Sequence, residues 1–179
     1  MMNRQQELFL IQARVSYRLF IRLKTEWDKS ATKEESGILP CCLLYQIQIA
    51  TENLAKAYLW RSGNPGKKHE VVQIFMRAIR SNDRLRRNLG YTDRKQWREE
   101  ITRLVRLALH IEALTPALAE KQTIRNRGQN HEYPWPADLP TQAPANYRFP
   151  IWDTICKTEM GNQWLQFLKG LFNHAEHCF

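Results

Sequence analysis

The residues best suited to chemistry lie together in one segment, 124–135, which reads Ile-Arg-Asn-Arg-Gly-Gln-Asn-His-Glu-Tyr-Pro-Trp. Arg125 and Arg127 carry guanidinium groups, which hold a phosphate through paired hydrogen bonds and stabilise charge that develops on it. His131 can take up or release a proton near neutral pH. Together these groups could cleave RNA without a metal ion, with histidine as acid or base and arginine on the oxyanion. The same residues also fit a polar loop that bonds to its own backbone, with its aromatic residues as packing anchors.

A second segment, residues 51–69, combines a charged pair with a basic helix start. Glu52 and Lys56 are four residues apart, so they can form an ion pair on one face of a helix. His69 follows two lysines where the next helix should begin, and it could donate to a phosphate or to a backbone group. The candidate phosphate-binding residues of this segment are Lys56, Lys67, Lys68 and His69. Alternatively, Lys56 is only a member of a surface pair and His69 an ordinary residue of a helix start.

The positive charge of the chain is concentrated in residues 61–106. The 179 residues hold 27 Lys and Arg against 18 Asp and Glu, a net charge of +9. Residues 61–106 hold 13 basic and 5 acidic residues, so this stretch carries +8 of that charge. Such clustering is the electrostatic footprint of a phosphate-bearing partner. A solvated helix face rich in arginine would have the same composition, and the charge count does not separate the two.

Length and composition exclude several classes of protein. The chain suits one domain, which we expect to span residues 1–179. A hydrophobic share of 43% excludes wholesale disorder and a collagen-like repeat. There is no run of about 18 uncharged apolar residues, so no membrane-spanning helix is expected. The first ten residues lack the apolar core of a signal peptide, and we therefore expect a cytoplasmic location.

The familiar enzyme motifs are absent from the sequence. It contains no glycine-rich dinucleotide or phosphate loop, no G-x-S-x-G and no H-E-x-x-H. His174, His177 and Cys178 form an H-x-x-H-C cluster, but no second pair of ligands accompanies it. We therefore expect neither a metal ion nor a cofactor.

Apolar residues recur at helical spacing along most of the chain, and no strand pattern with a period of two is found. One such stripe consists of Leu8, Ile11, Val15, Leu19 and Leu23. Asp93 is placed to cap a long helix. The expected helices span residues 4–28, 41–61, 67–79, 94–120 and 151–175, with a helical turn inside 80–93. The predicted fold is all-α, an up-and-down helical bundle of four to six helices.

A proline-rich loop is expected at about residues 134–150, before the last helix. It holds five of the eight prolines, too many for a helix and badly placed for strands. Its aromatic residues Trp135, Tyr147 and Phe149 are expected to tie it to the body of the protein. Loops of this length in a compact domain are often functional.

Both candidate segments resemble the HEPN superfamily (higher eukaryotes and prokaryotes nucleotide-binding domain). Members often carry E-x-x-x-K-A-x-L on one helix, then a Gly-Pro turn and a helix-opening histidine. The matching residues here are Glu52, Lys56, Ala57, Leu59, Gly63, Pro65 and His69. Many members also carry R-x(4–6)-H, often with Asn after the Arg and with H-x-Y at the end. The matching residues are Arg125, Asn126, His131 and Tyr133, with five residues between Arg and His.

The resemblance implies a metal-independent endoribonuclease of a toxin–antitoxin or other defence system. Arg125 and His131 would be catalytic, and Asn126 and Tyr133 would support them. The residues that would bind RNA or a nucleotide are Lys56, Lys67, Lys68, His69 and Arg127. The R…H motifs of two subunits would face each other in a homodimer, and an antitoxin would be a partner. Inactive members imply the alternative, a non-catalytic nucleotide- or protein-binding module that partners a nucleotidyltransferase.

Overall fold

The computed structural model describes residues 2–29, 38–63, 70–114 and 149–179. Within these ranges the chain forms seven α-helices and one short 3₁₀ turn and contains no strand, which confirms the all-α class. The helices are α1 (Arg4–Lys29), α2 (Ile38–Leu59), α3 (Val71–Ile79), α4 (Asp83–Asn88), α5 (Arg94–Glu112), α7 (Pro150–Lys157) and α8 (Glu159–Cys178). The 3₁₀ turn, η1 (Trp60–Ser62), directly follows α2.

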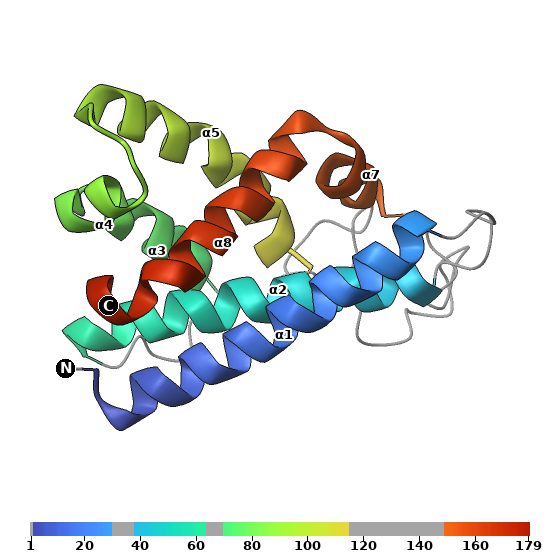
Figure 1. Ribbon diagram of the computed structural model, residues 1–179, viewed down its shortest axis with the longest axis horizontal. Helices are drawn as coiled ribbons and strands as arrows, with labels where there is room; N and C mark the ends of the chain where they lie inside the picture. The colour runs from blue at the N-terminus through green and yellow to red at the C-terminus, as the bar shows by residue number, and fades with distance from the viewer. Residues whose placement is uncertain (1, 30–37, 64–69, 115–148) are drawn as a thin grey trace.

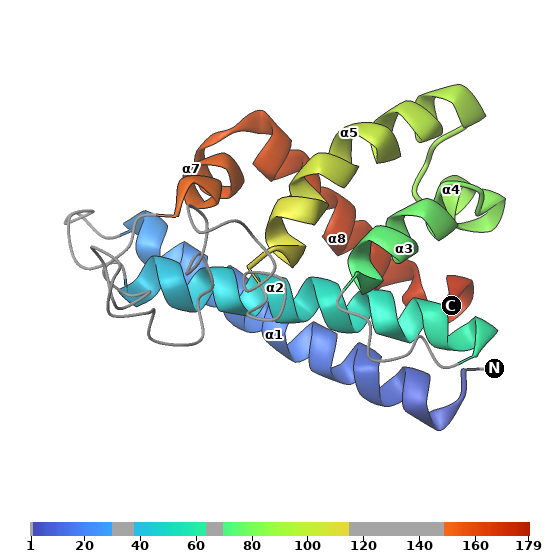
Figure 2. The same cartoon turned by 180° about the vertical axis from the view of Figure 1, so that it is seen from behind.

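The two longest helices, α1 and α2, lie antiparallel along the long axis of the molecule (Figure 1). Helices α3, α4, α5 and α8 all lie to one side of α2 in both views (Figure 2). Helix α8 is tied to α1 by a stack of Tyr17 on Phe172, with 4.8 Å between ring centroids. The Tyr17 hydroxyl also donates to the Leu165 carbonyl at 3.2 Å. The last helix is therefore packed against the first, and the chain ends lie close together.

Helix α1 begins with a reciprocal cap between Asn3 and Gln6. The Gln6 N–H donates to Asn3 Oδ1 at 3.0 Å, and the Asn3 N–H donates to Gln6 Oε1 at 3.1 Å. Two N–H groups that the first helical turn leaves free are satisfied in this way. The buried Gln6 side chain also donates to the Ala57 carbonyl at 3.1 Å, which fixes the start of α1 against the end of α2.

The apolar stripe expected on α1 lies on its outer side. The helix spans nearly the expected range, but Leu8, Ile11, Val15 and Leu19 are exposed. The buried residues of α1 are instead Gln6, Leu10, Ala13, Ser16 and Phe20. Small Ala13 and Ser16 let α2 approach closely, so the packing face follows shape rather than the strongest run of hydrophobicity.

The core lies between α2, α3, α5 and α8, where the large side chains are fully buried. Trp97 of α5 and Trp164 of α8 are 1% and 0% exposed. The Trp97 indole N–H donates to the Ile79 carbonyl at 3.2 Å, so the polar atom of this ring is satisfied at the end of α3. This contact holds the end of α3 against α5.

Several helix ends follow from single residues that the sequence identifies. Asp93 caps α5 by accepting from the N–H groups of Lys95 and Gln96 at 3.0 and 3.2 Å, as predicted. The helix expected over 41–61 passes into η1 and stops at Gly63, whose φ of +112° suits glycine alone. The helical turn expected within 80–93 is α4, and Asn82 caps it by accepting from the Leu85 N–H at 2.9 Å.

One helix ends earlier than expected, near Pro116, which can shorten a helix, and another breaks where one continuous helix is expected. Helix α5 ends at Glu112 rather than continuing through 114, and residues 115–120 lie outside the described part. The single helix expected over 151–175 is two helices, α7 and α8, separated at Thr158. The backbone of Thr158 is extended, and its hydroxyl accepts from the Gly161 N–H at 3.1 Å, so it starts a new helix. The prediction of one final helix was therefore wrong.

The proline-rich loop lies outside the described residues except for its last two. Phe149 is 1% exposed, and Pro150 occupies the first turn of α7. Proline is tolerated there because the N–H it lacks would have no partner inside the helix. The anchoring role expected for Phe149 fits its burial, whereas Trp135 and Tyr147 are not described.

Candidate nucleic-acid interface

Of the nine site residues predicted from the sequence, Lys56 is the one that the structure describes. It lies on α2 and donates to Glu52 Oε1 at 2.5 Å, which confirms the expected pair. Its ammonium group also lies 5.8 Å from the ring centroid of Phe9. Its side chain is 25% exposed, so Lys56 is largely committed to contacts within the fold. The others lie outside the described residues: Lys67, Lys68, His69, Arg125, Asn126, Arg127, His131 and Tyr133.

The described residues that flank these two segments lie in contact. Val72 follows the 64–69 segment, and Glu112 precedes the 115–148 segment. The Val72 N–H donates to Glu112 Oε1 at 2.6 Å, so the start of α3 and the end of α5 are joined. One end of each of these two segments is therefore close to this hydrogen bond in the sequence.

Glu112 is a buried carboxyl group at this junction, with 4% of its surface exposed. Burial raises the pKa of Glu112 to about 7, and repulsion from Glu52 and Glu70 acts in the same direction. Hydrogen bonds from the backbone of Val72 and Gln73 act in the opposite direction, because they favour the charged carboxylate. The carboxyl group therefore changes protonation near neutral pH at the start of α3.

The basic segment forms a groove along α5, bounded by the end of α3 and the start of α8. Its volume is about 890 Å³. The basic residues that line it, together with Thr102 and Met160, define what we call the arginine groove: Arg80, Arg94, Lys95, Arg98, Arg103 and Arg106. Two smaller hollows adjoin it, of about 300 and 230 Å³, and Arg80 and Arg98 line all three. These two side chains therefore lie at the centre of the concave basic surface.

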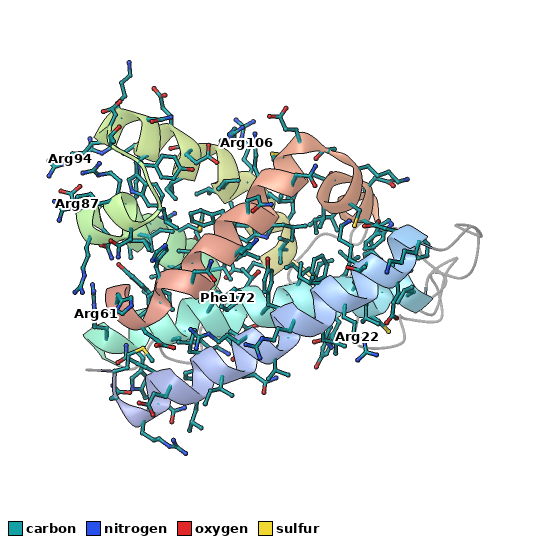
Figure 3. All side chains as sticks on the ribbon, in the orientation of Figure 1. Arg22, Arg61, Arg87, Arg94, Arg106 and Phe172 are labelled. Atoms are coloured by element: carbon teal, nitrogen blue, oxygen red, sulfur yellow. The ribbon has the colours of Figure 1, made fainter. Side chains whose placement is uncertain are left out.

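The spacing along α5 explains how the groove arises. Arg94, Arg98, Thr102 and Arg106 are each four residues apart, so they follow one face of the helix. At a rise of about 1.5 Å per residue, the row spans about 18 Å. The opposite face carries Trp97, Ile101 and Leu104, which are buried. In Figure 3, Arg94 and Arg106 project outward near the two ends of this row.

Some arginines of the segment are committed to holding the fold. Arg86 is buried and donates to the carbonyls of Tyr91 and Thr92 at 2.5 and 2.6 Å, and to Asp83 at 3.1 Å. Arg94 pairs with the same Asp83. Hydrogen bonds from Arg94 and Arg86 hold the pKa of Asp83 below its usual value. Asp83 thus remains charged, and its ion pair with Arg94 connects α4 to the start of α5.

Other arginines form no ion pair within the described part of the chain: Arg77, Arg80, Arg84, Arg87, Arg98 and Arg106. All six are exposed. The groove holds two acidic residues, of which Asp93 is bound to the N–H groups at the start of α5 and keeps a lowered pKa. Glu99 is the other. The groove therefore has unneutralised positive charge in a concave surface, which is what attracts and holds a polyanion.

The sequence locates this surface only as a stretch of charge and does not identify its lining residues. Arginine at three of the four positions 94, 98, 102 and 106 is the signal that could have found it, because that spacing places these residues on one helical face. Met160 could not have been found in this way, because it joins the groove from α8, more than fifty residues further along the chain.

Among the described residues, no three His, Cys, Asp or Glu side chains lie together as a metal site would require. None of the helices in the described ranges has the length and the apolar character of a membrane span. No family model, no curated protein and no solved structure matches the chain. Its function must therefore be inferred from its own residues.

Proposed function

We propose that the protein is RNA-directed and binds the phosphate backbone of RNA in the arginine groove. The observation that carries the proposal is the group of exposed arginines, led by Arg80 and Arg98, that have no acidic partner among the described residues. Arginine favours phosphate because its planar guanidinium presents paired donors. A merely solvated helix face would have its charges spread over a convex surface, whereas here five arginines and a lysine line one hollow.

The proposal extends to a HEPN-like metal-independent endoribonuclease. In it, Arg125 would stabilise charge on the scissile phosphate and His131 would move a proton, with Asn126 and Tyr133 in support. Support comes from the two motifs and from the all-helical fold. The Glu112–Val72 hydrogen bond adds to this, because it joins described residues that lie close in the sequence to one end of each motif segment. A helical bundle with a proline-rich loop before the last helix, and a homodimer with an antitoxin as partner, belong to the same proposal.

Binding is tested by fluorescence anisotropy with a short single-stranded RNA. Arg80→Glu with Arg98→Glu should weaken binding by at least about tenfold, because two phosphate contacts become repulsive. The matched control is Lys157→Glu with Lys169→Glu, which changes the net charge equally on α7 and α8. If the two double variants bind equally, the groove is not the RNA-binding surface.

Cleavage is tested by incubating total RNA with the purified protein in EDTA, beside His131→Ala. The proposal predicts that the wild-type protein cuts the RNA and that the variant does not. If neither cuts the RNA but both bind it, the protein is the alternative, a binding module that partners a nucleotidyltransferase. If His131→Ala cuts as well as the wild type, the catalytic assignment of His131 is wrong.

A further inference from the structure

The outer side of α1 carries an exposed row of apolar side chains. Leu8, Ile11, Val15 and Leu19 have 44%, 54%, 55% and 39% of their surface exposed. Of the six large apolar side chains that are exposed in the described residues, five lie on α1. Contiguous apolar patches of this kind mark interaction surfaces, whereas single exposed apolar residues do not. In Figure 1, α1 forms one long outer edge of the described part of the molecule.

Each end of the apolar row is flanked by one ion pair. Arg4 and Glu7 pair at 3.6 Å in the first turn, and Arg22 and Glu26 pair at 3.3 Å near the other end. All four side chains are at least 44% exposed. In both pairs the arginine precedes the glutamate along the helix, so the order of charges reverses when the helix is turned end to end.

We infer that α1 docks against α1 of a second copy of this chain, antiparallel, with the twofold axis at Val15. In this register, residues whose numbers add to 30 lie opposite each other. Ile11 then meets the partner's Leu19, and Val15 meets the partner's Val15. Arg4 meets the partner's Glu26, and Glu7 lies one residue from the level of the partner's Arg22. Leu8 lies opposite the partner's Arg22, so the apolar contact is made by Ile11, Val15 and Leu19, with the charged residues of the two ion pairs on either side of it.

The charges exclude the parallel arrangement. Two parallel copies of α1 would place Arg4 against the partner's Arg4 and Glu7 against the partner's Glu7, and like charges across an interface are costly. Helix α1 holds six basic and three acidic residues, a balance that also attracts an anionic membrane, and binding to vesicles is therefore one arm of the test. A twofold, self-complementary contact is the commonest form of homodimer. In Figure 3, Arg22 lies on the outer side of α1, where this contact would form.

This inference assigns a surface on α1 to the homodimer that belongs to the proposed function, and that surface shares no residue with the arginine groove. The arginine groove lies on α3, α5 and α8, whereas the docking surface lies on α1. Loss of the dimer with RNA binding intact, or the reverse, would therefore separate the two.

Sedimentation velocity at several protein concentrations tests the inference. The wild-type protein should form a dimer, and Val15→Glu should raise its dissociation constant by at least about tenfold, because two carboxylates would meet on the twofold axis. Gln166→Glu, which adds one negative charge to an exposed position of α8, should leave the dimer unchanged. A protein that is monomeric at every concentration, or a dimer that Val15→Glu leaves intact, would overturn the inference.

Charge reversal tests the register without touching the apolar row. Arg22→Glu alone should weaken the dimer, since its new carboxylate would face the partner's Glu7. Adding Glu7→Arg in the same chain should restore the dimer, because each reversed charge again meets its opposite. Failure of the second change to restore the dimer would contradict the antiparallel register. Binding of the monomer to vesicles of anionic lipid, in place of dimerisation, would assign the face to a membrane instead.

Discussion

The carboxylate of Glu112 accepts a hydrogen bond from the Val72 N–H at 2.6 Å and joins the end of α5 to the start of α3. Negative charge at a helix N-terminus is favourable, because the N–H groups of the first turn have no partners within the helix. The same bond closes a path of forty residues, so α3, α4 and α5 form one connected unit. That unit supports the whole of the arginine groove apart from Met160.

Stability should fall as the pH rises towards 7. The pKa of Glu112 is raised to about 7 in the folded protein from its ordinary value of 4.5, mainly by burial. Between these values the folded state binds more protons than the unfolded state, so the free energy of unfolding decreases with rising pH. Glu112→Gln should remove this part of the pH dependence and raise stability above pH 7, because the amide oxygen can still accept from Val72. Urea unfolding at pH 5, 6, 7 and 8 measures the effect.

The hydrogen bond itself is tested by Glu112→Leu. This change leaves the Val72 N–H buried without a partner, and we expect a loss of about 1–3 kcal/mol at pH 5. Equal stability of the Gln and Leu variants at that pH would show that the bond contributes nothing.

Two arginines of the basic segment should behave in opposite ways. Arg86→Ala leaves the carbonyls of Tyr91 and Thr92 without this donor and removes one of the two arginines that bond to Asp83, so the free energy of unfolding should fall by about 3 kcal/mol. Arg98→Ala removes an exposed side chain and should change stability by less than about 0.5 kcal/mol. RNA affinity should follow the reverse order at a temperature where both variants are folded. Equal losses of stability would contradict the division into structural and binding arginines.

The corner between α7 and α8 should tolerate no side chain at Gly161. A Cβ atom there would lie 2.2 Å from the Ile155 carbonyl oxygen and 2.3 Å from that of Thr154. Gly161→Ala should therefore lower the free energy of unfolding by at least about 2 kcal/mol, because backbone would have to move. Gly170→Ala, on the same helix, is the control. Its Cβ would meet the end of the flexible Leu89 side chain at 2.6 Å, and we expect a smaller loss. A larger loss for Gly170→Ala in thermal unfolding would contradict this difference.

The ends of helices were predictable where a single residue determines them. Asp93 starts α5 and Gly63 ends the α2 region, because capping and positive φ are properties of single residues. The face of α1 was not predictable. Hydrophobic spacing alone selects Val15 and its neighbours, but α2 packs against Ala13, where small side chains permit close contact. The break at Thr158 was missed although the spacing gives a sign of it: Ile155 and Trp164 are nine residues apart and would lie on opposite faces of one continuous helix, yet both are buried.

The arginine groove was only partly predictable from the sequence. The charge of residues 61–106 could be counted. The count does not show that Arg86 is buried and donates its hydrogen bonds to backbone carbonyls. Nor does it show that Arg80 and Arg98, from different elements, line one hollow. These facts depend on how α3 and α5 pack. The Arg125 and His131 site remains a prediction, since it lies outside the described residues.

The salt dependence of RNA binding tests the central claim most directly. The logarithm of the association constant falls linearly with the logarithm of salt concentration, by about 0.7 for each phosphate contact on a single strand. Arg80→Ala with Arg98→Ala should therefore reduce the slope by about 1.4, while Lys157→Ala with Lys169→Ala leaves it unchanged. Because the two variants have equal net charge, RNA binding in the arginine groove predicts this difference in slope. Equal slopes for the two variants and the wild-type protein would contradict it.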